Sequence, residues 1–504
     1  QTEPLLTMND PRINVGNTIQ NSRTVQLNPT LSMVALYNKF GFVRSMNQAD
    51  KSKAAGFLIN LITSLKNISG AYTKTEGTFL PGYLPKTGFI GQDLSLNAPG
   101  YDFIFGGQQD IRTRSLENGW ITRDSLLNQL YINTIKEDMS FRGLIEPIRD
   151  LRIELTATKS QSFNYSTNFK FLPSTNSFEN LSPVTTGDFN ISFFSLKTAF
   201  SKENKLNNSS RLFQQFQENR TIISQRLGAQ NPNSSGSAGG FADGYSKSSQ
   251  DVLIASFMAA YTGKDANKVS LNRFPKVPIP NWRLSYNGLT KYSFFNEIFT
   301  SVDINHAYRS LYSVNGFNSL VRYQESNGAV NVKDASGNFL PFYQFSQITL
   351  FEQFLPLFGV DVRLKNNMTL NLEYRKSRAL SFSLSNSQLA QQKEDGAVFG
   401  LGYRTTKFRF PFGLFKSLKL DNDMNFKMDF ALTDRKLVIY RADVEDAEVS
   451  SGAKNITARP SVDYVLNQRF TMRLFYDGNI TKPYTSQTFN TSFSNFGVNL
   501  RFNL

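Results

Sequence analysis

Apolar and polar residues alternate almost without interruption between positions 418 and 433 of this chain. Leu, Met and Phe occupy the even positions apart from Asn422, and Lys, Asp and Asn occupy most of the odd positions. A repeat of two residues is typical of a β-strand with one apolar and one polar face. Strands in soluble proteins usually end after about five or six residues. The length of the pattern therefore predicts a strand that crosses a lipid bilayer and extends beyond it.

The same alternation occurs in further segments, namely residues 153–171, 302–312, 360–384, 397–403, 462–476 and 489–504. Within 360–384 a turn-like KNN separates two strands, and Lys376 and Arg378 interrupt the apolar face of the second. That second strand would span roughly 55 Å, whereas the hydrocarbon core of a bilayer is about 30 Å thick. We therefore expect these two cations where the strand leaves the lipid and enters solvent.

The last alternating segment changes its parity. Phe489 and Phe493 share one parity and Phe496 and Val498 the other, which predicts a bulge near Ser494–Asn495. All alternating segments together predict roughly ten to fourteen strands, many of them longer than ten residues and tilted by about 40°.

Two insertions show instead the period of 3.6 residues that is typical of an amphipathic helix. The first covers about 53–68 and aligns Phe57, Leu61, Leu65 and Ile68. The second begins at a capping residue, Ser209 or Ser210, and aligns Leu212, Phe213, Phe216, Ile223 and Leu227.

Residues 248–263 are apolar around most of a helical circumference, which predicts a helix buried against other structure. The Gly-, Ser- and Asn-rich stretch 228–249 has almost no residues for packing and is interpreted as a loop. Such insertions are too large for porin turns and indicate caps or plugs at the mouth of a barrel. The predicted organisation is strands with a helical insertion (1–125), barrel strands (126–208), a helical and Gly/Ser-rich insertion (209–280), and barrel strands (281–504).

The composition favours membrane-spanning β-structure. The chain holds 45 Phe and 20 Tyr among 504 residues, yet it is polar on average, which suits long strands with one apolar face. It has no apolar run of about eighteen residues, the length that a membrane-spanning helix needs. Paired strands are the other structure that satisfies every backbone group in lipid. We therefore predict an all-β fold, a transmembrane antiparallel β-barrel with helical loop insertions.

The net charge and the absence of cysteine limit the kinds of site and partner that the chain can have. The absence of cysteine excludes disulfides, thiolate metal sites and thiol nucleophiles. The net charge of +15 is spread along the chain, so contacts with lipopolysaccharide phosphates or a cationic lumen wall explain it without nucleic acid. The first residues lack an initiating Met and the regions of a signal peptide. We expect either that a signal was removed or that the chain is a piece of a longer protein.

Candidate catalytic and metal-binding groups are few. His306, the only histidine, lies near Asp303 and Ser310, as a membrane-embedded Ser/His hydrolase would require, but packing among barrel aromatics is the simpler interpretation. The acidic run 443–450 lacks the spacing of an EF-hand loop, and no GxxxxGK[ST] phosphate loop occurs. We predict no enzyme, no cofactor, and no catalytic or metal-binding residue.

Several long and uncommon strings stand out, namely SQDVLIASFMAAYTGK (249–264), FPKVPIPNWRLSYNGLTKY (274–292), HAYRSLYSVNGFNS (306–319) and GVDVRLKNNMTLNLEYRKSRALSFSLSNSQLAQQ (359–392). Together they resemble the C-terminal part of the SprA/Sov family, the outer-membrane translocon of the type IX secretion system of Bacteroidota. The likeness extends from about residue 78 to about 404. The motif residues, for which the resemblance implies a structural or gating role, are Pro280, Asn281, Trp282, His306, Tyr308, Arg309, Ser310, Tyr374, Lys376, Ser377 and Arg378.

The resemblance implies a single-chain barrel, several times longer than this chain, in the bacterial outer membrane. Such a barrel conducts folded proteins with a type IX C-terminal signal from the periplasm to the cell surface, through a wide pore with a lateral opening. The implied partners are the remainder of the same barrel chain, a PorV-type shuttle barrel, a periplasmic plug protein, the secreted cargo, and lipids and lipopolysaccharide. The chain matches only the C-terminal part of the family and cannot close the full pore alone.

In this interpretation the apolar residues of the long strand face lipid, namely Leu420, Met424, Phe426, Met428 and Phe430, and its Asp, Lys and Asn residues line a hydrated lumen. Two other functions stay open. A plugged nutrient importer would need a plug domain and an energy-coupling box, which residues 1–60 do not contain. A structural or adhesive surface barrel would use the insertions and no pore. Large insertions usually lie outside the cell, although a periplasmic cap is also compatible with the sequence.

Overall fold

The structure is a computed structural model that describes residues 13–39, 41, 63–204, 206–409, 419–420, 422–441, 447–467, 469–485 and 488–502. Sixteen strands form one antiparallel sheet, and thirteen of them follow one continuous path. The large antiparallel sheet that the alternation predicted is therefore confirmed. Within the described residues this sheet does not close into a barrel, because β1 and β22 each pair on one side only.

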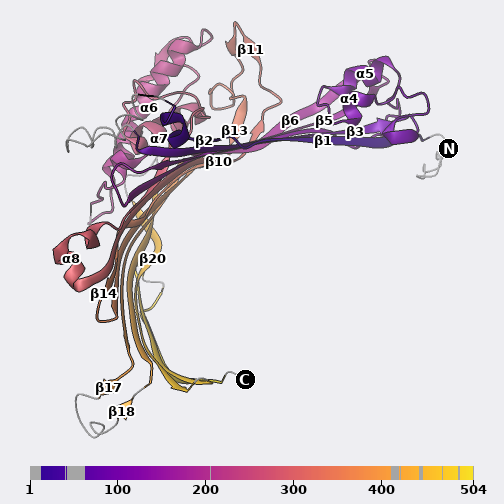
Figure 1. Ribbon diagram of the computed structural model, residues 1–504. Helices are drawn as coiled ribbons and strands as arrows, with labels where there is room; N and C mark the ends of the chain where they lie inside the picture. Colours follow the sequence, from indigo (N-terminus) through magenta and orange to yellow (C-terminus); the bar gives the residue numbers. More distant parts are fainter. Residues whose placement is uncertain are drawn as a thin grey trace.

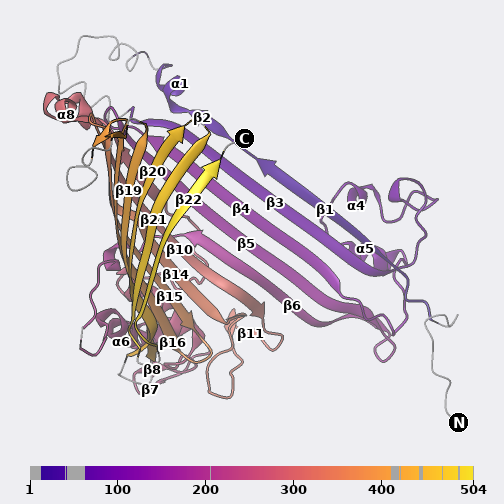
Figure 2. The ribbon, with the colours of Figure 1, turned by 90° about the horizontal axis from the view of Figure 1, so that it is seen from below.

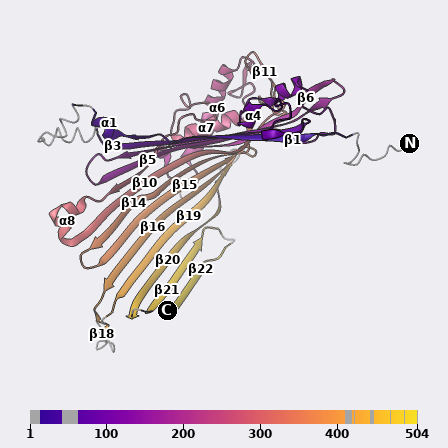
Figure 3. The same cartoon turned by 45° about the vertical axis from the view of Figure 1, so that its right-hand side comes forward.

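The strands on the path are β1 (Asn17–Leu27), β3 (Leu65–Tyr83), β4 (Tyr131–Ile145), β5 (Leu151–Leu172), β6 (Ser177–Ser192), β10 (Phe299–Ser319), β14 (Gln347–Leu364), β15 (Met368–Ser383), β16 (Gln388–Thr405), β19 (Met424–Arg441), β20 (Glu448–Asn467), β21 (Phe470–Pro483) and β22 (Thr491–Phe502). Three short strands join the sheet beside it, namely β2 (Thr30–Ser32), β9 (Asn281–Tyr286) and β13 (Tyr343–Phe345). Figures 2 and 3 show the long strands side by side.

Three separate strand pairs lie outside this sheet, namely β7 (Ser237–Ala238) with β8 (Phe241–Ala242), β11 (Glu325–Ser326) with β12 (Ala329–Val330), and β17 (Phe408–Arg409) with β18 (Lys419–Leu420). The helices are α1 (Met33–Tyr37), η1 (Phe89–Gly91), α4 (Tyr101–Ile104), α5 (Ile111–Glu117), η2 (Leu196–Thr198), α6 (Arg211–Gln230), α7 (Gln250–Thr262), η3 (Leu289–Lys291) and α8 (Ser293–Ile298). No helix in the described ranges is long and apolar enough to cross a membrane.

The strand predicted over 418–433 begins and ends later than its pattern indicated. Leu420 belongs to β18, and β19 starts only at Met424, opposite Thr405 at the end of β16. Leu418 and Asp421 lie outside the described residues. The alternation continues through the break because it records which face a residue occupies, whereas the start of β19 depends on where its partner strand ends.

The helix predicted over 53–68 is wrong at its C-terminal end. Leu65 and Ile68 lie in β3, opposite Ile145 and Gly143 of β4. Cross-strand pairing therefore overrides the helical spacing at these two positions. Phe57 and Leu61, the other two residues of the predicted face, lie outside the described residues.

The bulge predicted near Ser494–Asn495 is also wrong. β22 pairs with β21 in an unbroken register from Thr491 to Phe502. Phe493 consequently points to the face opposite that of Phe496. An aromatic residue on the polar face gives the same sequence pattern as a bulge, so parity alone could not separate the two.

Figure 1 shows the sheet bent into two arms, with β1 to β6 in one and β14 to β22 in the other. Helices α4, α5, α6 and α7 lie on the outer side of this bend (Figure 1). We call the side that these helices cover the outer face of the sheet, and the opposite side the inner face. Since successive residues of a strand point to opposite faces, each face receives every second residue.

The insertion that contains α6 and α7 leaves the sheet from the middle of a strand. β6 and β9 run in the same direction between β5 and β10, and they follow one another along both neighbours. β6 ends at Ser192, opposite Leu311, and β9 begins at Asn281. Residues 193–280 thus form an insertion within one strand, of which β6 and β9 are the two halves. The insertion begins at residue 193, which is 16 residues before the predicted boundary at 209.

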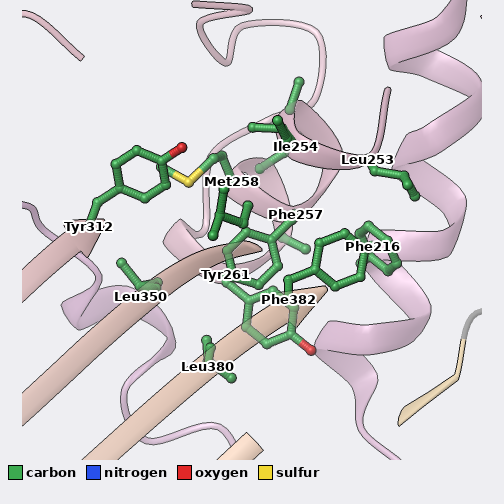
Figure 4. Close-up of a cluster of buried hydrophobic side chains, with 14 of the residues drawn as sticks. Phe216, Leu253, Ile254, Phe257, Met258, Tyr261, Tyr312, Leu350, Leu380 and Phe382 are labelled. Carbon is green, nitrogen blue, oxygen red and sulfur yellow. The ribbon is translucent and has the colours of Figure 1, made fainter. Parts of the chain in front are cut away.

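The two helices of this insertion form as predicted. The Ser210 side chain accepts a hydrogen bond from the amide of Phe213 and caps α6. All residues of α7 from Val252 to Thr262 are buried. The Phe257 ring of α7 stacks on Phe382 of β15 with ring centres 5.6 Å apart, and Phe216 of α6 meets the same ring edge-on at 5.3 Å (Figure 4).

The stretch 228–249 differs from the loop without packing residues that the sequence predicted. Ala242 and Tyr245 are buried in a small cluster with Val252 and Phe339. Asn231 donates hydrogen bonds to the Tyr245 hydroxyl and to the Val330 carbonyl. The loop therefore packs against residues 320–342, which are too distant in the sequence for composition to reveal.

Candidate functional site

The outer face carries a continuous exposed apolar surface on the C-terminal arm. We call it the apolar band, and its residues are Leu370, Leu372, Tyr374, Phe399, Leu401, Tyr403, Phe426, Met428, Phe430, Leu432, Ile456, Val462, Leu474, Tyr476, Phe496, Val498, Leu500 and Phe502. Leu372 is 39% exposed, Met428 41% and Val498 55%. A patch of this size is far larger than the apolar patches that soluble monomers expose.

The residues predicted to face lipid divide into three groups. Met428 and Phe430 lie exposed in the apolar band. Phe426 is half-buried between Tyr403 and Phe408. Met424 is only 5% exposed, so the structure does not place it on the exposed surface with Met428 and Phe430. The side chain of Leu420 lies outside the described part of the chain.

Charged residues border the apolar band on the same face. Lys376, Asp395, Asp434, Lys454 and Lys482 lie directly opposite one another on consecutive strands from β15 to β21. We call this line the charged row. The ammonium group of Lys376 lies 2.7 Å from Asp395, and that of Lys454 lies 3.6 Å from Asp434. Both carboxylates also accept a tyrosine hydroxyl, from Tyr374 and Tyr484 respectively.

Similar polar contacts cross the outer face of the N-terminal arm. Arg23 of β1 and Lys74 of β3 each lie 2.8 Å from the carboxylate of Glu76. On β4, Glu137 accepts hydrogen bonds from Tyr72 and Gln161. The outer face of the N-terminal arm therefore also carries polar contacts between neighbouring strands.

Above the charged row, the insertion covers the outer face and buries an ion pair. Glu352 of β14 lies directly opposite Arg378 of β15, and their side chains are 2% and 4% exposed. A guanidinium nitrogen of Arg378 lies 2.9 Å from Glu352 and also donates to the Thr198 hydroxyl. A second nitrogen donates to the Thr198 carbonyl at 2.9 Å. The pair thus holds η2, the first turn of the insertion, against two strands.

The second carboxylate oxygen of Glu352 completes this network. It accepts hydrogen bonds from the hydroxyls of Ser195 and Tyr308, each at 2.8 Å. Ser195 also contacts the Ser310 hydroxyl at 3.0 Å. These hydroxyls and the guanidinium group supply the partners that a buried carboxylate requires. We call Ser195, Thr198, Tyr308, Glu352 and Arg378 the junction network.

Three predicted motif residues lie beside the junction network at the strand break. The Asn281 side-chain carbonyl accepts the amide hydrogen of Ser310 at 2.7 Å. Trp282 stacks on Tyr308 with ring centres 4.5 Å apart. Pro280 is exposed and directly precedes β9. These residues fix the point at which the chain returns from the insertion to the sheet.

His306 is a packed residue in this structure. Its Nδ1 atom lies 2.7 Å from the Leu357 carbonyl, and its ring lies near Trp282 and Phe354. Among the described contacts, none joins His306 to Asp303 or Ser310. The described ranges also contain no group of three or more metal-ligating side chains, and residues 443–446 of the acidic run lie outside them.

The inner face is polar and charged. Several of its arginines meet a carboxylate on their own or a neighbouring strand, as in the pairs Arg375–Glu373, Arg435–Glu394, Arg459–Asp477 and Arg473–Asp463. The predicted motif residues Arg309 and Ser377 point to this face. Arg309 lines an open groove of about 410 Å³ together with Glu154 and Arg283.

Two ion pairs that lie away from the sheet fix the insertion, one within it and one to a neighbouring segment. Arg273 contacts Asp251 of α7 at 2.6 Å, and Lys333 contacts Asp243 at 2.7 Å. The hydrogen bond from Lys333 lowers the pKa of the Asp243 carboxyl below its usual value. The second pair joins the insertion to the segment that follows β10.

The structure therefore brings together five predicted motif residues, namely Asn281, Trp282, Tyr308, Ser310 and Arg378, and places Tyr374 and Lys376 at the charged row. Sequence reasoning missed Glu352, Ser195 and Thr198. Glu352 had a signal in the sequence, because it is a single acid at an apolar position between Leu350 and Phe354. Ser195 and Thr198 had none, since only the folded insertion places them beside Arg378.

No model of a known protein family matches the chain, and no curated protein matches it at a significant level.

Proposed function

We propose that this chain forms part of the wall of a large protein-conducting β-barrel in the bacterial outer membrane. The observation that supports this most is the change along the outer face of β15, β16 and β19, from an exposed apolar band through a charged row to a protein-covered region. Lipid would solvate the first region, the membrane surface the second, and the insertion covers the third. A soluble protein would have no reason to leave the first of these regions uncovered.

The height of the apolar band fits this proposal. Eight residue steps separate Met368, at the start of β15, from Lys376, which is about 27 Å along an antiparallel strand. A tilt of about 40° reduces this length to roughly 21 Å, close to the apolar belt of about 25 Å in outer-membrane barrels. The charged row would then lie at the surface of the membrane.

The inner face supports a water-filled lumen. Several of its charges are paired with neighbouring charges and most of its groups are polar, as expected of a surface in water rather than lipid. A path of thirteen strands that has not closed within the described residues also favours a wide barrel. In this proposal the remainder of the same barrel pairs with β1 and β22, and the type IX function implied by the sequence resemblance requires a pore wide enough for folded cargo.

The arrangement of connections supports an orientation. The insertion 193–280 and the connections 84–130 and 320–342 lie toward one end of the strands, whereas the opposite end holds short turns such as 146–150 and 365–367 together with the connections from β2 to β3 and from β16 to β19. Outer-membrane barrels have short turns in the periplasm and long loops outside the cell. We therefore assign the insertions to the cell surface. A PorV-type shuttle barrel, a periplasmic plug and secreted cargo are the partners in this proposal.

Cysteine labelling tests the proposal, because the chain has no cysteine of its own. Lys427→Cys and Met428→Cys are neighbours on opposite faces of β19. In outer membranes that contain the full-length protein, a water-soluble maleimide should label Lys427→Cys and leave Met428→Cys unmodified, while both react after denaturation. Attachment of a bulky maleimide to Lys427→Cys should then reduce export of type IX cargo.

Equal labelling of the two variants in membranes would contradict a membrane wall. Selective labelling without an effect on export, together with no conductance in planar bilayers, would favour the adhesive surface barrel instead. The control is Leu372→Cys, a second position in the apolar band, which should behave like Met428→Cys.

A further inference from the structure

Two lysines lie beside one tyrosine ring at the border of the apolar band, and a third lysine lies directly opposite one of them. Lys454 of β20 lies directly opposite Lys482 of β21. The ammonium groups of Lys436 and Lys454 lie 5.5 and 5.8 Å from the centre of the Tyr484 ring. We call Lys436, Lys454, Lys482 and Tyr484 the lysine cluster.

The cluster has too little negative charge for its cations. Among the described residues, Asp434 is the one carboxylate in contact with it, and that group accepts the Tyr484 hydroxyl at 2.6 Å and lies 3.6 Å from Lys454. Lys482 is exposed and has no ion pair among the described residues. Like charges directly opposite on neighbouring strands destabilise a sheet unless another group neutralises them.

The same arrangement occurs a short distance away with its counter-charge present. Lys393 of β16 lies directly opposite Lys436 of β19. There the insertion supplies Glu203, whose carboxylate lies 2.7 Å from Lys393. For Lys454 and Lys482, the described part of the insertion supplies no such acid, and their outer face stays open to the surroundings.

We infer that the lysine cluster binds the phosphate groups of an anionic lipid headgroup in the outer leaflet. This inference rests on the proposed function, because it requires that the apolar band lies in lipid. Ile456 and Ile480 lie directly opposite each other, two residues below Lys454 and Lys482, so acyl chains on the band would bring a headgroup to the level of the lysines. Ammonium groups form charge-assisted hydrogen bonds with phosphate oxygens.

The occupant is a phosphorylated glycolipid rather than a free anion. A free phosphate would be held only by exposed side chains, which bind weakly, whereas a lipid gains further affinity from the adjacent apolar band. Tyr484 suits this position because an aromatic ring with a hydroxyl group is favoured where lipid meets water. The other basic residues of the charged row and its neighbour, Lys376 and Lys393, already contact carboxylates.

Lipid retention tests the inference on the full-length protein. The protein is placed in nanodiscs of phosphatidylcholine with one-tenth lipid A, and bound lipid A is quantified by mass spectrometry. Lys454→Gln/Lys482→Gln should retain lipid A less well, by about fivefold for each lysine removed. The matched control, Lys365→Gln/Lys407→Gln, removes the same charge from exposed positions at the other end of the sheet and should retain the wild-type amount.

Equal retention in the cluster variant and the wild type would overturn the inference. Displacement of the bound species by inorganic phosphate, with no preference for lipid A over phosphatidylcholine alone, would assign the cluster to a free anion and overturn the lipid. Thermal unfolding with and without lipid A checks that both variants fold. Met428→Cys should become labelled in membranes only if the membrane proposal is wrong. This result distinguishes failure of the proposed function from failure of the lipid inference alone.

Discussion

The outer face of β15 has the same apolar pattern in the first and second halves of the strand, but the two halves differ in exposure. Leu372 and Tyr374 are 39% and 41% exposed, whereas Leu380 and Phe382 on the same face are fully buried under the insertion. Both pairs of residues have the same spacing and the same apolar character. An apolar face therefore does not by itself indicate whether protein or lipid covers it.

Two cations lie where the exposed part of β15 meets the buried part. Lys376 occupies the charged row and is partly exposed, and Arg378, two residues further, is buried and paired with Glu352. The structure gives the two cations different surroundings. Lys376 lies at the border, while Arg378 anchors the insertion above it.

The largest expected effect comes from breaking the buried pair. Arg378→Met leaves the Glu352 carboxylate without its cation in a buried site, which should cost about 3–5 kcal/mol and loosen the insertion. Protease sensitivity of residues 193–280 and thermal unfolding of the full-length protein measure this effect.

Two controls test whether the loss comes from the pair. Lys376→Met removes a half-exposed cation on the same face and should cost at most about 1 kcal/mol. Glu352→Leu/Arg378→Met should be more stable than Arg378→Met alone, because no unpaired charge stays buried. A double variant as unstable as the sum of the two single variants would show that the residues act independently.

A charge in the apolar band should have the next largest effect. Phe430→Arg places a cation near the middle of the band and should destabilise the barrel by about 2–4 kcal/mol. Asp429→Arg, the adjacent residue on the inner face, should have little effect because the proposal places that face in water. The amount of folded protein in the outer membrane and its thermal transition provide the measurement. If Asp429→Arg destabilised the protein more than Phe430→Arg, the assignment of the two faces to lipid and lumen would have to be reversed.

The smallest effect concerns only the covered part of the face. Ser210→Ala removes the cap of α6 and should cost about 1 kcal/mol. The transition of the insertion should shift while labelling of the apolar band stays unchanged. Ser209→Ala, for which the described contacts include no side-chain hydrogen bond, is the control. Equal shifts in the two variants would argue against a capping role.

Much of the fold follows from local periodicity. Residues 360–384 predict β15 and its hairpin with β14, since alternation fixes which residues share a face. The cap at Ser210 and the apolar composition of 248–263 predict α6 and α7 in the same way. Two of the five residues of the junction network, Tyr308 and Arg378, also lie in segments that the sequence singled out, but Glu352, the partner of Arg378, was missed.

The sequence by itself determined the faces of the strands, because each side chain alternates with its immediate neighbours. Only the tertiary structure decided what covers those faces. In the structure β19 starts at Met424, and Leu65 and Ile68 belong to a strand rather than a helix. One strand is interrupted after Ser192, and Thr198 accepts hydrogen bonds from Arg378. Each of these outcomes depends on pairing between segments that are distant in the chain, and such pairing leaves no periodic trace in the sequence.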